Sequence, residues 1–328
     1  MSLGDIGILI AVATLAFLLA GAMAPFEALG WWAGWYGRRL EPPHPRPTKH
    51  REPPAAHRFV IFLSGVHSVS GRAFAKREKE FLLRLRRRLP GVIFLQVFPY
   101  SVTNRPLTGQ RLFAWFWRWA LRMKRTRMAV IGLLINLRNA WQVAVSADRR
   151  YGPIYNQGSA ELLLSALEQA GYQPDSGLPV TLIGYSGGGQ VAVGAASHLK
   201  EILKVPVTVI ALGGVLSSDP GLLQLDRLYF LYGDRDEVQR LAGLLFPGRW
   251  PLLPYSTWNQ ARAQGNIEFI QLGPMTHTGK GVYLDAETLL PDGFSYLERT
   301  VEVVAELIHR GAPQPSPRKT ASQQAPGS

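Results

Sequence analysis

The feature that most constrains the fold is a regular alternation of short apolar runs with longer amphipathic stretches. Uninterrupted apolar runs are typical of strands that are buried on both faces, and the stretches between them carry apolar side chains at helical spacing. The runs cover residues 59–63, 92–97, 180–183, 205–211, 228–231 and 267–271. This alternation predicts an α/β fold, in which helices cover both faces of a mainly parallel sheet.

Four amphipathic stretches are predicted to be helices. They cover residues 74–89, 159–170, 188–200 and 294–309. Ser159 is expected to cap the start of the second helix and Gly171 to end it. Residues 103–155 break the alternation and predict a helical insertion that is rich in aromatic and basic residues. Such a segment suits a lid over an apolar pocket or a helix at a membrane interface, and an internal helix pair with core aromatics is an equal alternative.

The N-terminal run Ile6–Phe26 contains no charged residue. It reaches the length of about 20 residues that a helix needs to cross the hydrocarbon core of a membrane. Aromatic residues and then arginines follow it, as at a membrane–water boundary. A cleaved signal peptide fits less well, because the first five residues carry no Lys or Arg and Pro25 would follow the cleavage site. The sequence predicts a single-pass transmembrane helix. The positive charge after it, beginning at Arg38, predicts that the bulk of the chain is cytoplasmic.

Composition divides the rest of the chain. Residues 1–40 form the predicted anchor with its flank, and residues 41–57, rich in proline and charge, predict an extended linker. Residues 58–310 form one domain that includes the 103–155 insertion. Residues 311–328 contain too few apolar side chains to pack and are expected to be disordered.

Charge and cysteine content limit the classes of function. Lys and Arg total 36 against 23 Asp and Glu, a net charge of +13, which favours an anionic surface such as lipid headgroups. No nucleic-acid-binding motif accompanies this charge, so nucleic acid is not expected as a partner. The absence of cysteine excludes thiol nucleophiles and thiolate metal sites. With no zinc-protease, phosphate-loop or dinucleotide motif in the sequence, neither a metal nor a cofactor is predicted.

One motif carries a specific chemistry. Gly184-Tyr185-Ser186-Gly187-Gly188 follows an apolar run and opens a predicted helix, so its serine would stand on a tight turn above the sheet edge. A serine needs a base that is oriented by a carboxylate. The next candidates along the chain are Asp234 and Asp236 after run 228–231 and His277 after run 267–271, with Asp219 as a weaker acid. Each follows the carboxyl end of a strand, where parallel sheets bind ligands.

With these residues in this order, the chain resembles the α/β-hydrolase superfamily over residues 58–310. The resemblance implies that the acid lies three residues after the glycine of a G-x-x-D turn, which is Asp236, with Asp234 as the substitute. It also implies an oxyanion hole from the N–H groups of Gly187 and of the loop after the first strand, here Val66. The superfamily commonly has a His-Gly pair in this loop, and this sequence has Gly65-Val66-His67-Ser68 instead. The neighbouring His67 is either a supporting residue or an unconnected loop histidine.

The sequence therefore predicts a membrane-anchored serine hydrolase. Ser186, His277 and Asp236 would cleave a carboxylic ester, an acyl ester or a lipid, through an acyl-enzyme intermediate. The alternative from another class is a non-catalytic, membrane-tethered interaction protein that retains an α/β-hydrolase fold, because a fold does not determine a function.

Overall fold

The computed structural model of this chain describes residues 14–15, 17–35, 56–69, 75–103, 118 and 128–310. The predicted linker, except residues 56–57, and the predicted C-terminal tail lie outside the described residues. The same is true of residues 6–13 and 16 of the N-terminal apolar run, and of most of segment 104–127, which holds the aromatic and basic stretches of the predicted insertion.

The centre of the molecule is a parallel sheet with the strand order β2-β1-β3-β4-β5-β6. Its strands are β1 (Arg58–Leu63), β2 (Val92–Val97), β3 (Val180–Tyr185), β4 (Val207–Leu212), β5 (Arg227–Tyr232) and β6 (Ile267–Gln271). All residues of β1, β3 and β4 are buried, as their uninterrupted apolar runs predict. The predicted α/β fold with a mainly parallel sheet is confirmed for the described residues.

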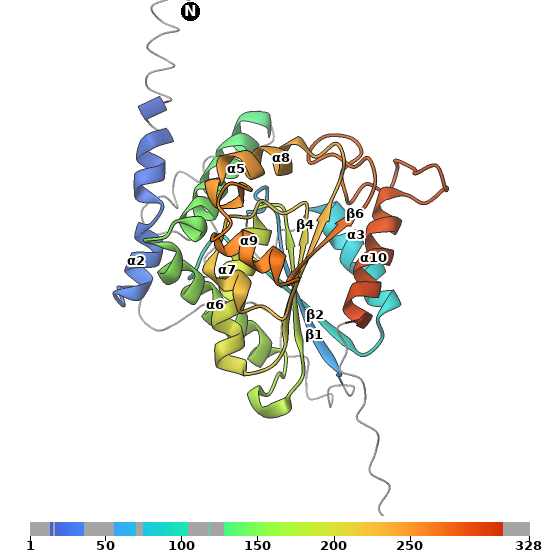
Figure 1. Ribbon diagram of the computed structural model, residues 1–328, viewed down its shortest axis with the longest axis horizontal. Coiled ribbons are helices and arrows are strands. Elements are labelled where there is room, and N and C mark those ends of the chain that lie inside the picture. The colour runs from blue at the N-terminus through green and yellow to red at the C-terminus, as the bar shows by residue number, and fades with distance from the viewer. Residues whose placement is uncertain are drawn as a thin grey trace, which may run out of the picture.

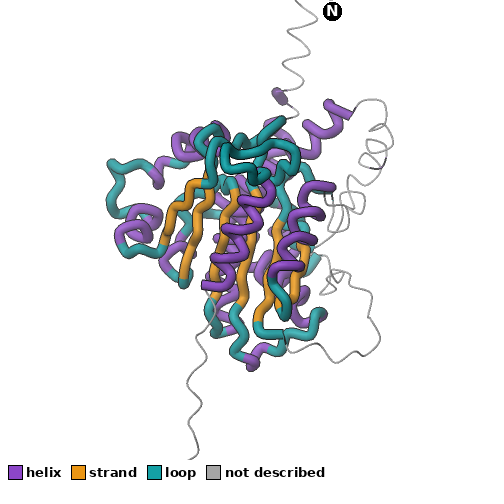
Figure 2. Tube along the Cα trace, turned by 90° about the vertical axis from the view of Figure 1, so that its right-hand side faces the viewer, coloured by secondary structure: helices purple, strands orange, loops and turns teal. Residues whose placement is uncertain are grey.

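Helices cover both faces of this sheet. On one face, α3 (Lys76–Arg88) contacts α10 (Tyr296–Arg310), and Figure 2 views the sheet through this pair of helices. On the other face, α7 (Gly188–Leu203) packs on β3 and β4, and α6 (Gly152–Gln169) packs on α7 (Figure 1). Each face buries its own apolar cluster, one around Phe81 and Leu82 and the other around Val191 and Leu163. These two clusters hold the helical layers on the sheet.

Two short helices follow β5 and form the edge of the domain beside β6. They are α8 (Glu237–Leu245) and α9 (Thr257–Ala263), separated by the 3₁₀ turn η4 (Pro247–Arg249). Two further 3₁₀ turns are η2 (Pro174–Ser176) and η3 (Pro220–Leu223). The guanidinium of Arg249 stacks over the ring of Trp258 at 4.2 Å, and burial lowers the pKa of Arg249 to about 10.

The largest difference between a predicted and an observed helix boundary is at the start of α6. The helix expected to begin after Ser159 begins at Gly152, and the Ser159 hydroxyl donates to the carbonyl of Tyr155 inside the helix rather than capping its end. A tertiary contact explains why one residue of this stretch is a glycine. A side chain at Gly158 would lie 3.2 Å from the ring of Trp31, so the glycine lets the N-terminal helix pack closely.

The described part of the insertion is helical. Most of it belongs to α5 (Met128–Ala147) and the beginning of α6, and α5 packs on both α6 and α7. Gln142 Nε2 donates to the carbonyl of Ala24 at 3.2 Å, so α5 also contacts the N-terminal residues.

The N-terminal residues lie on the domain. The helix α2 (Phe26–Trp32) packs on α6 and buries Ala28 and Gly30. Large apolar side chains of this helix and of the residues on either side of it are exposed: Leu15, Phe17, Leu18, Leu19, Met23, Phe26, Trp32 and Trp35. No helix within the described residues is both long enough and apolar enough to cross a membrane.

Candidate active site

The serine of the G-Y-S-G-G motif stands on a strained turn between β3 and α7. Ser186 has a φ of +53°, a left-handed conformation that a residue with a side chain adopts at a cost of about 1–3 kcal/mol. Its N–H donates to the carbonyl of Leu212 at 3.0 Å, and its own carbonyl accepts from the N–H of Gly189 at 3.0 Å. These bonds hold the turn, and they raise the hydroxyl above the carboxyl end of the sheet.

Two glycines of the motif are required by close backbone contacts. A side-chain carbon on Gly184 would lie 2.5 Å from the Cα of Gly189, and one on Gly188 would lie 2.6 Å from the carbonyl oxygen of Leu63. Both distances are shorter than any carbon contact permits. The absence of side chains therefore allows α7 to begin directly against β1 and β3.

The structure brings the serine, the histidine and one of the aspartates into a hydrogen-bonded chain. Ser186 Oγ lies 2.8 Å from His277 Nε2, and His277 Nδ1 lies 2.9 Å from Asp236 Oδ2 and 3.1 Å from Asp236 Oδ1. Ser186 follows β3, Asp236 directly precedes α8, and His277 lies in the loop after β6. Three separate strands therefore deliver these residues to one edge of the sheet, the edge at which such sheets bind ligands.

Asp236 is enclosed by hydrogen-bond donors. Its side chain is fully buried, the Tyr283 hydroxyl donates to Oδ2 at 2.6 Å, and the N–H of Gln239 donates to Oδ1 at 2.9 Å. Burial raises the pKa of Asp236, but the hydrogen bonds from His277, Tyr283 and Gln239, together with the charge of the His277 ring, outweigh it and lower the pKa below its ordinary value. Asp236 is therefore held as a carboxylate that faces His277.

The sequence analysis did not identify Tyr283, which completes the surroundings of this carboxylate. Its hydroxyl accepts from the N–H of Gly233 at 2.9 Å while it donates to Asp236. Burial raises the pKa of Tyr283 well above its ordinary range, and the negative charge of Asp236 adds to the effect, so the hydroxyl stays protonated and remains a donor. No motif marks this tyrosine in the sequence.

The Tyr283→Phe variant is expected to lose about 1–3 kcal/mol of stability at pH 7. Because the pKa of Asp236 is lower in the folded than in the unfolded protein, its ionisation stabilises the folded state above the ordinary pKa of about 3.9. This stabilisation is lost as the pH falls through the lowered pKa. Removing the hydroxyl raises this pKa, so the stability gap to the wild type should narrow as the pH falls through the folded-state pKa of the variant and then through the lower one of the wild type. Urea unfolding at pH 7 and pH 3 measures the gap. Tyr296→Phe, whose hydroxyl makes no hydrogen bond to Asp236, is the control, and an equal gap at both pH values would contradict the prediction.

The other two candidate acids lie elsewhere. Asp234 accepts from Gln271 Nε2 at 2.5 Å. Asp219 caps the 3₁₀ turn η3, where it accepts from the N–H of Gly221 at 2.8 Å and from Gln190 Nε2 at 3.2 Å. Neither forms a hydrogen bond to His277, so Asp236 is the carboxylate that orients this ring.

The two expected oxyanion donors are neighbours. A side-chain carbon on Gly187 would lie 2.8 Å from Val66 Cγ1, so the two loops are in contact. Among the described residues, neither the N–H of Gly187 nor that of Val66 donates a hydrogen bond to a protein acceptor. Two N–H groups without a protein acceptor, one of them on the residue that follows Ser186, can hold a developing negative charge.

Glu78 of α3 holds the loop that carries Val66. Its carboxylate is buried and accepts from the N–H of Gly65 at 3.2 Å. His67 Nε2 lies 3.3 Å from the same oxygen, so this histidine contacts the support of the loop. The structure therefore connects His67 to the site through Glu78.

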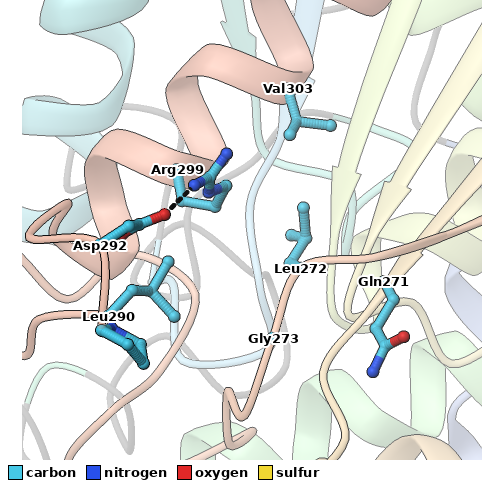
Figure 3. Close-up of a pocket in the computed structure, with 8 residues that line it drawn as sticks. Gln271, Leu272, Gly273, Leu290, Asp292, Arg299 and Val303 are labelled. Carbon is cyan, nitrogen blue, oxygen red and sulfur yellow. Dashed lines mark hydrogen bonds and ion pairs between the residues drawn. The ribbon is translucent and has the colours of Figure 1, made fainter.

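Access to the site is narrow within the described residues. Ser186 is 7% exposed, and the side chain of His277 is 11% exposed. A surface hollow of about 510 Å³ lies elsewhere, between the end of β6 and α10, and Figure 3 shows Arg299 pointing to its ion-pair partner Asp292 beside it. No group of three or more His, Asp and Glu side chains in the described part of the chain could hold a metal ion.

Comparisons with known proteins found a distant structural similarity and no similar sequence. No protein-family model and no curated protein match this sequence. One solved structure with a similar arrangement is described as "the crystal structure of the putative cell surface hydrolase from Lactobacillus plantarum WCFS1". It is 11% identical, with a TM-score of 0.36, over 79% of this chain and 92% of that one.

Proposed function

We propose that this protein is a serine hydrolase that cleaves carboxylic esters through an acyl-enzyme at Ser186. The observation that carries the proposal is the chain of short hydrogen bonds from Ser186 Oγ through the ring of His277 to the buried carboxylate of Asp236. Nucleophile, base and orienting acid in this geometry are the parts that acyl transfer needs. The left-handed turn at Ser186 adds support, because strained backbone of this kind is concentrated at functional sites.

In the first half of the reaction, Ser186 Oγ attacks the carbonyl carbon of the ester and its proton passes to His277 Nε2. Asp236 holds the other ring nitrogen and stabilises the imidazolium that forms. The carbonyl oxygen becomes an oxyanion, which accepts hydrogen bonds from the N–H groups of Gly187 and Val66. The intermediate then collapses, the C–O bond to the alcohol breaks, and the departing oxygen takes the proton from His277.

In the second half, water attacks the acyl-enzyme and gives its proton to His277 Nε2. A second oxyanion forms in the same place, and its collapse breaks the bond between the acyl carbon and Ser186 Oγ. The proton on His277 returns to Ser186, and the carboxylic acid leaves. His277 therefore acts once as base and once as acid in each half, and the enzyme ends as it began.

A fluorophosphonate probe tests this function, because it forms a stable bond to an activated serine. We expect the full chain to be labelled, and Ser186→Ala to be unlabelled while it stays folded. Folded wild-type protein that takes no label would overturn the proposal in favour of the non-catalytic, membrane-tethered interaction protein.

We propose further that the N-terminal apolar run anchors the protein in a membrane and that the substrate is an apolar acyl ester or a lipid. The support is the apolar surface that the described N-terminal residues expose. Contact of such a surface with water is unfavourable, and contact with lipid would remove it from water. A second exposed apolar set follows Asp236, in and after α8: Val238, Leu241, Leu244, Leu245, Trp250, Leu252, Leu253 and Tyr255. Figure 1 shows α8 and α5 at the end of the molecule toward which the residues before α2 also run.

Long acyl chains should be the better substrates. For the full chain in anionic vesicles, we expect kcat/KM to be at least about tenfold higher for p-nitrophenyl palmitate than for the butyrate, because each buried methylene contributes about 0.8 kcal/mol. Ser186→Ala serves as the blank for spontaneous hydrolysis. A preference for acetyl or butyryl esters that vesicles do not change would remove the lipid part of the proposal and leave the hydrolase part intact.

The orientation of the anchor follows from charge. All nearby basic residues, from Arg38 to Arg51, come after the apolar run, which favours a cytoplasmic C-terminal domain. A green fluorescent protein fused to the C-terminus should therefore fluoresce, and alkaline phosphatase at the same place should be inactive. An active phosphatase fusion would reverse the orientation.

A further inference from the structure

The N-terminal helix is tied to the domain by an ion pair. Glu27 Oε2 of α2 accepts from Arg138 Nη2 of α5 at 2.9 Å, and the two side chains are only 16% and 15% exposed. The other carboxylate oxygen of Glu27 accepts from the hydroxyls of Ser101 and Thr103. A carboxylate in this enclosed position, with donors on both oxygens, fixes the guanidinium that faces it.

Arg138 in turn fixes the next residue of α5. Its Nη1 donates to Asn139 Oδ1 at 3.1 Å and to the carbonyl of Tyr100. With its oxygen held by a cation, the Asn139 amide can direct only its nitrogen away from Arg138. Asn139 is fully buried, so this orientation has no competition from water.

The Asn139 nitrogen reaches the loop of the proposed oxyanion donor. Nδ2 donates to the carbonyl of Val66 at 2.6 Å and to the carbonyl of Ser68 at 2.8 Å. On the other side of Val66, the N–H of Gly65 is held by Glu78. The backbone around the Val66 N–H is thus fixed from both directions, by α3 on one side and by α5 on the other.

We infer that Asn139 is a positioning residue for the Val66 oxyanion donor, and that Glu27 of the N-terminal helix sets the orientation of Asn139 through Arg138. This inference rests on the proposed hydrolase function of Ser186. It makes the helix that follows the apolar run a part of the active-site support. An oxyanion donor acts only within a narrow range of positions, so loosening its loop lowers kcat much more than it weakens substrate binding.

Two variants and a matched control test the inference in the full chain. Asn139→Leu keeps roughly the same side-chain size and removes both donors, and we expect kcat on p-nitrophenyl butyrate to fall about 10- to 100-fold with KM changed less than about threefold. Glu27→Gln keeps the shape and removes the charge, and kcat should fall about 3- to 10-fold. Gln142→Leu breaks a contact between the same helix and Ala24 without touching the loop, and kcat should stay within about twofold.

A double mutant separates positioning from general destabilisation. If Glu27 acts through Asn139, Glu27→Gln in the Asn139→Leu background should change kcat by less than about twofold. Losses that multiply, or a Gln142→Leu loss as large as that of Glu27→Gln, would overturn the inference.

Hydrogen–deuterium exchange gives a readout that does not depend on activity. Backbone amides of residues 64–69 should exchange faster in Asn139→Leu and in Glu27→Gln than in the wild type, and should be unchanged in Gln142→Leu. Unchanged exchange at 64–69 in both variants would overturn the coupling. A wild-type protein that takes no fluorophosphonate label defeats the proposed function instead, and the exchange result still decides whether α2 holds this loop.

Discussion

Ser186→Ala and His277→Ala should each lower kcat by roughly 10³-fold or more, and the double variant should be little slower than either single one. The reason is that the two side chains act as one unit: without the base the hydroxyl is not activated, and without the hydroxyl the base has no proton to take. The 2.8 Å contact between Ser186 Oγ and His277 Nε2 is the basis of this expectation. Both residues lie in turns after strands, so the fold should persist.

Steady-state rates with an ester, together with circular-dichroism melting curves, measure this. His198→Ala is the matched control, because His198 lies on α7 away from the hydrogen-bonded chain and should keep the wild-type rate. A near-normal rate in His277→Ala would refute the role of this residue, whatever the Ser186 variant does.

Asp236→Asn should lower kcat by about 10³- to 10⁴-fold, with little change in KM. An amide in place of the carboxylate cannot stabilise a charged ring, and its NH₂ group would favour the wrong tautomer of His277. The matched control is Asp234→Asn, two residues away in the same turn, which should keep its rate within about threefold because its carboxylate pairs with Gln271. The reverse order of effects would mean that Asp234 takes over as the acid.

Much of the fold could be predicted because it follows from local patterns. The strands of the sheet appear in the sequence as runs of mostly apolar residues, and the order of Ser186, Asp236 and His277 along the chain places each after a different strand. The structure brings these three residues together, and their catalytic roles stay predictions. The resemblance to α/β-hydrolases implies Asp236 rather than Asp234, and the structure also places Asp236 beside His277.

The remaining features depend on contacts between distant segments. Tyr283 reaches Asp236 across 47 positions, and Asn139 reaches Val66 across 73. Neither residue stands in a motif, and an asparagine or a tyrosine in isolation gives no sign of its partner. The close packing of Trp31 on Gly158 in α6 likewise joins residues that are more than 100 positions apart.

The ion pair between Glu27 and Arg138 joins two residues that the ribosome adds at different times. The two residues are 111 positions apart, so at 5–20 residues per second about 6–22 s separate their addition to the chain. During that interval Glu27 lacks Arg138, and α2 lacks α6, on which it packs. The helix α2 is therefore made well before the segments that hold it, α5 and α6, and the loop around Val66 gains its support from α5 only after α5 has been made.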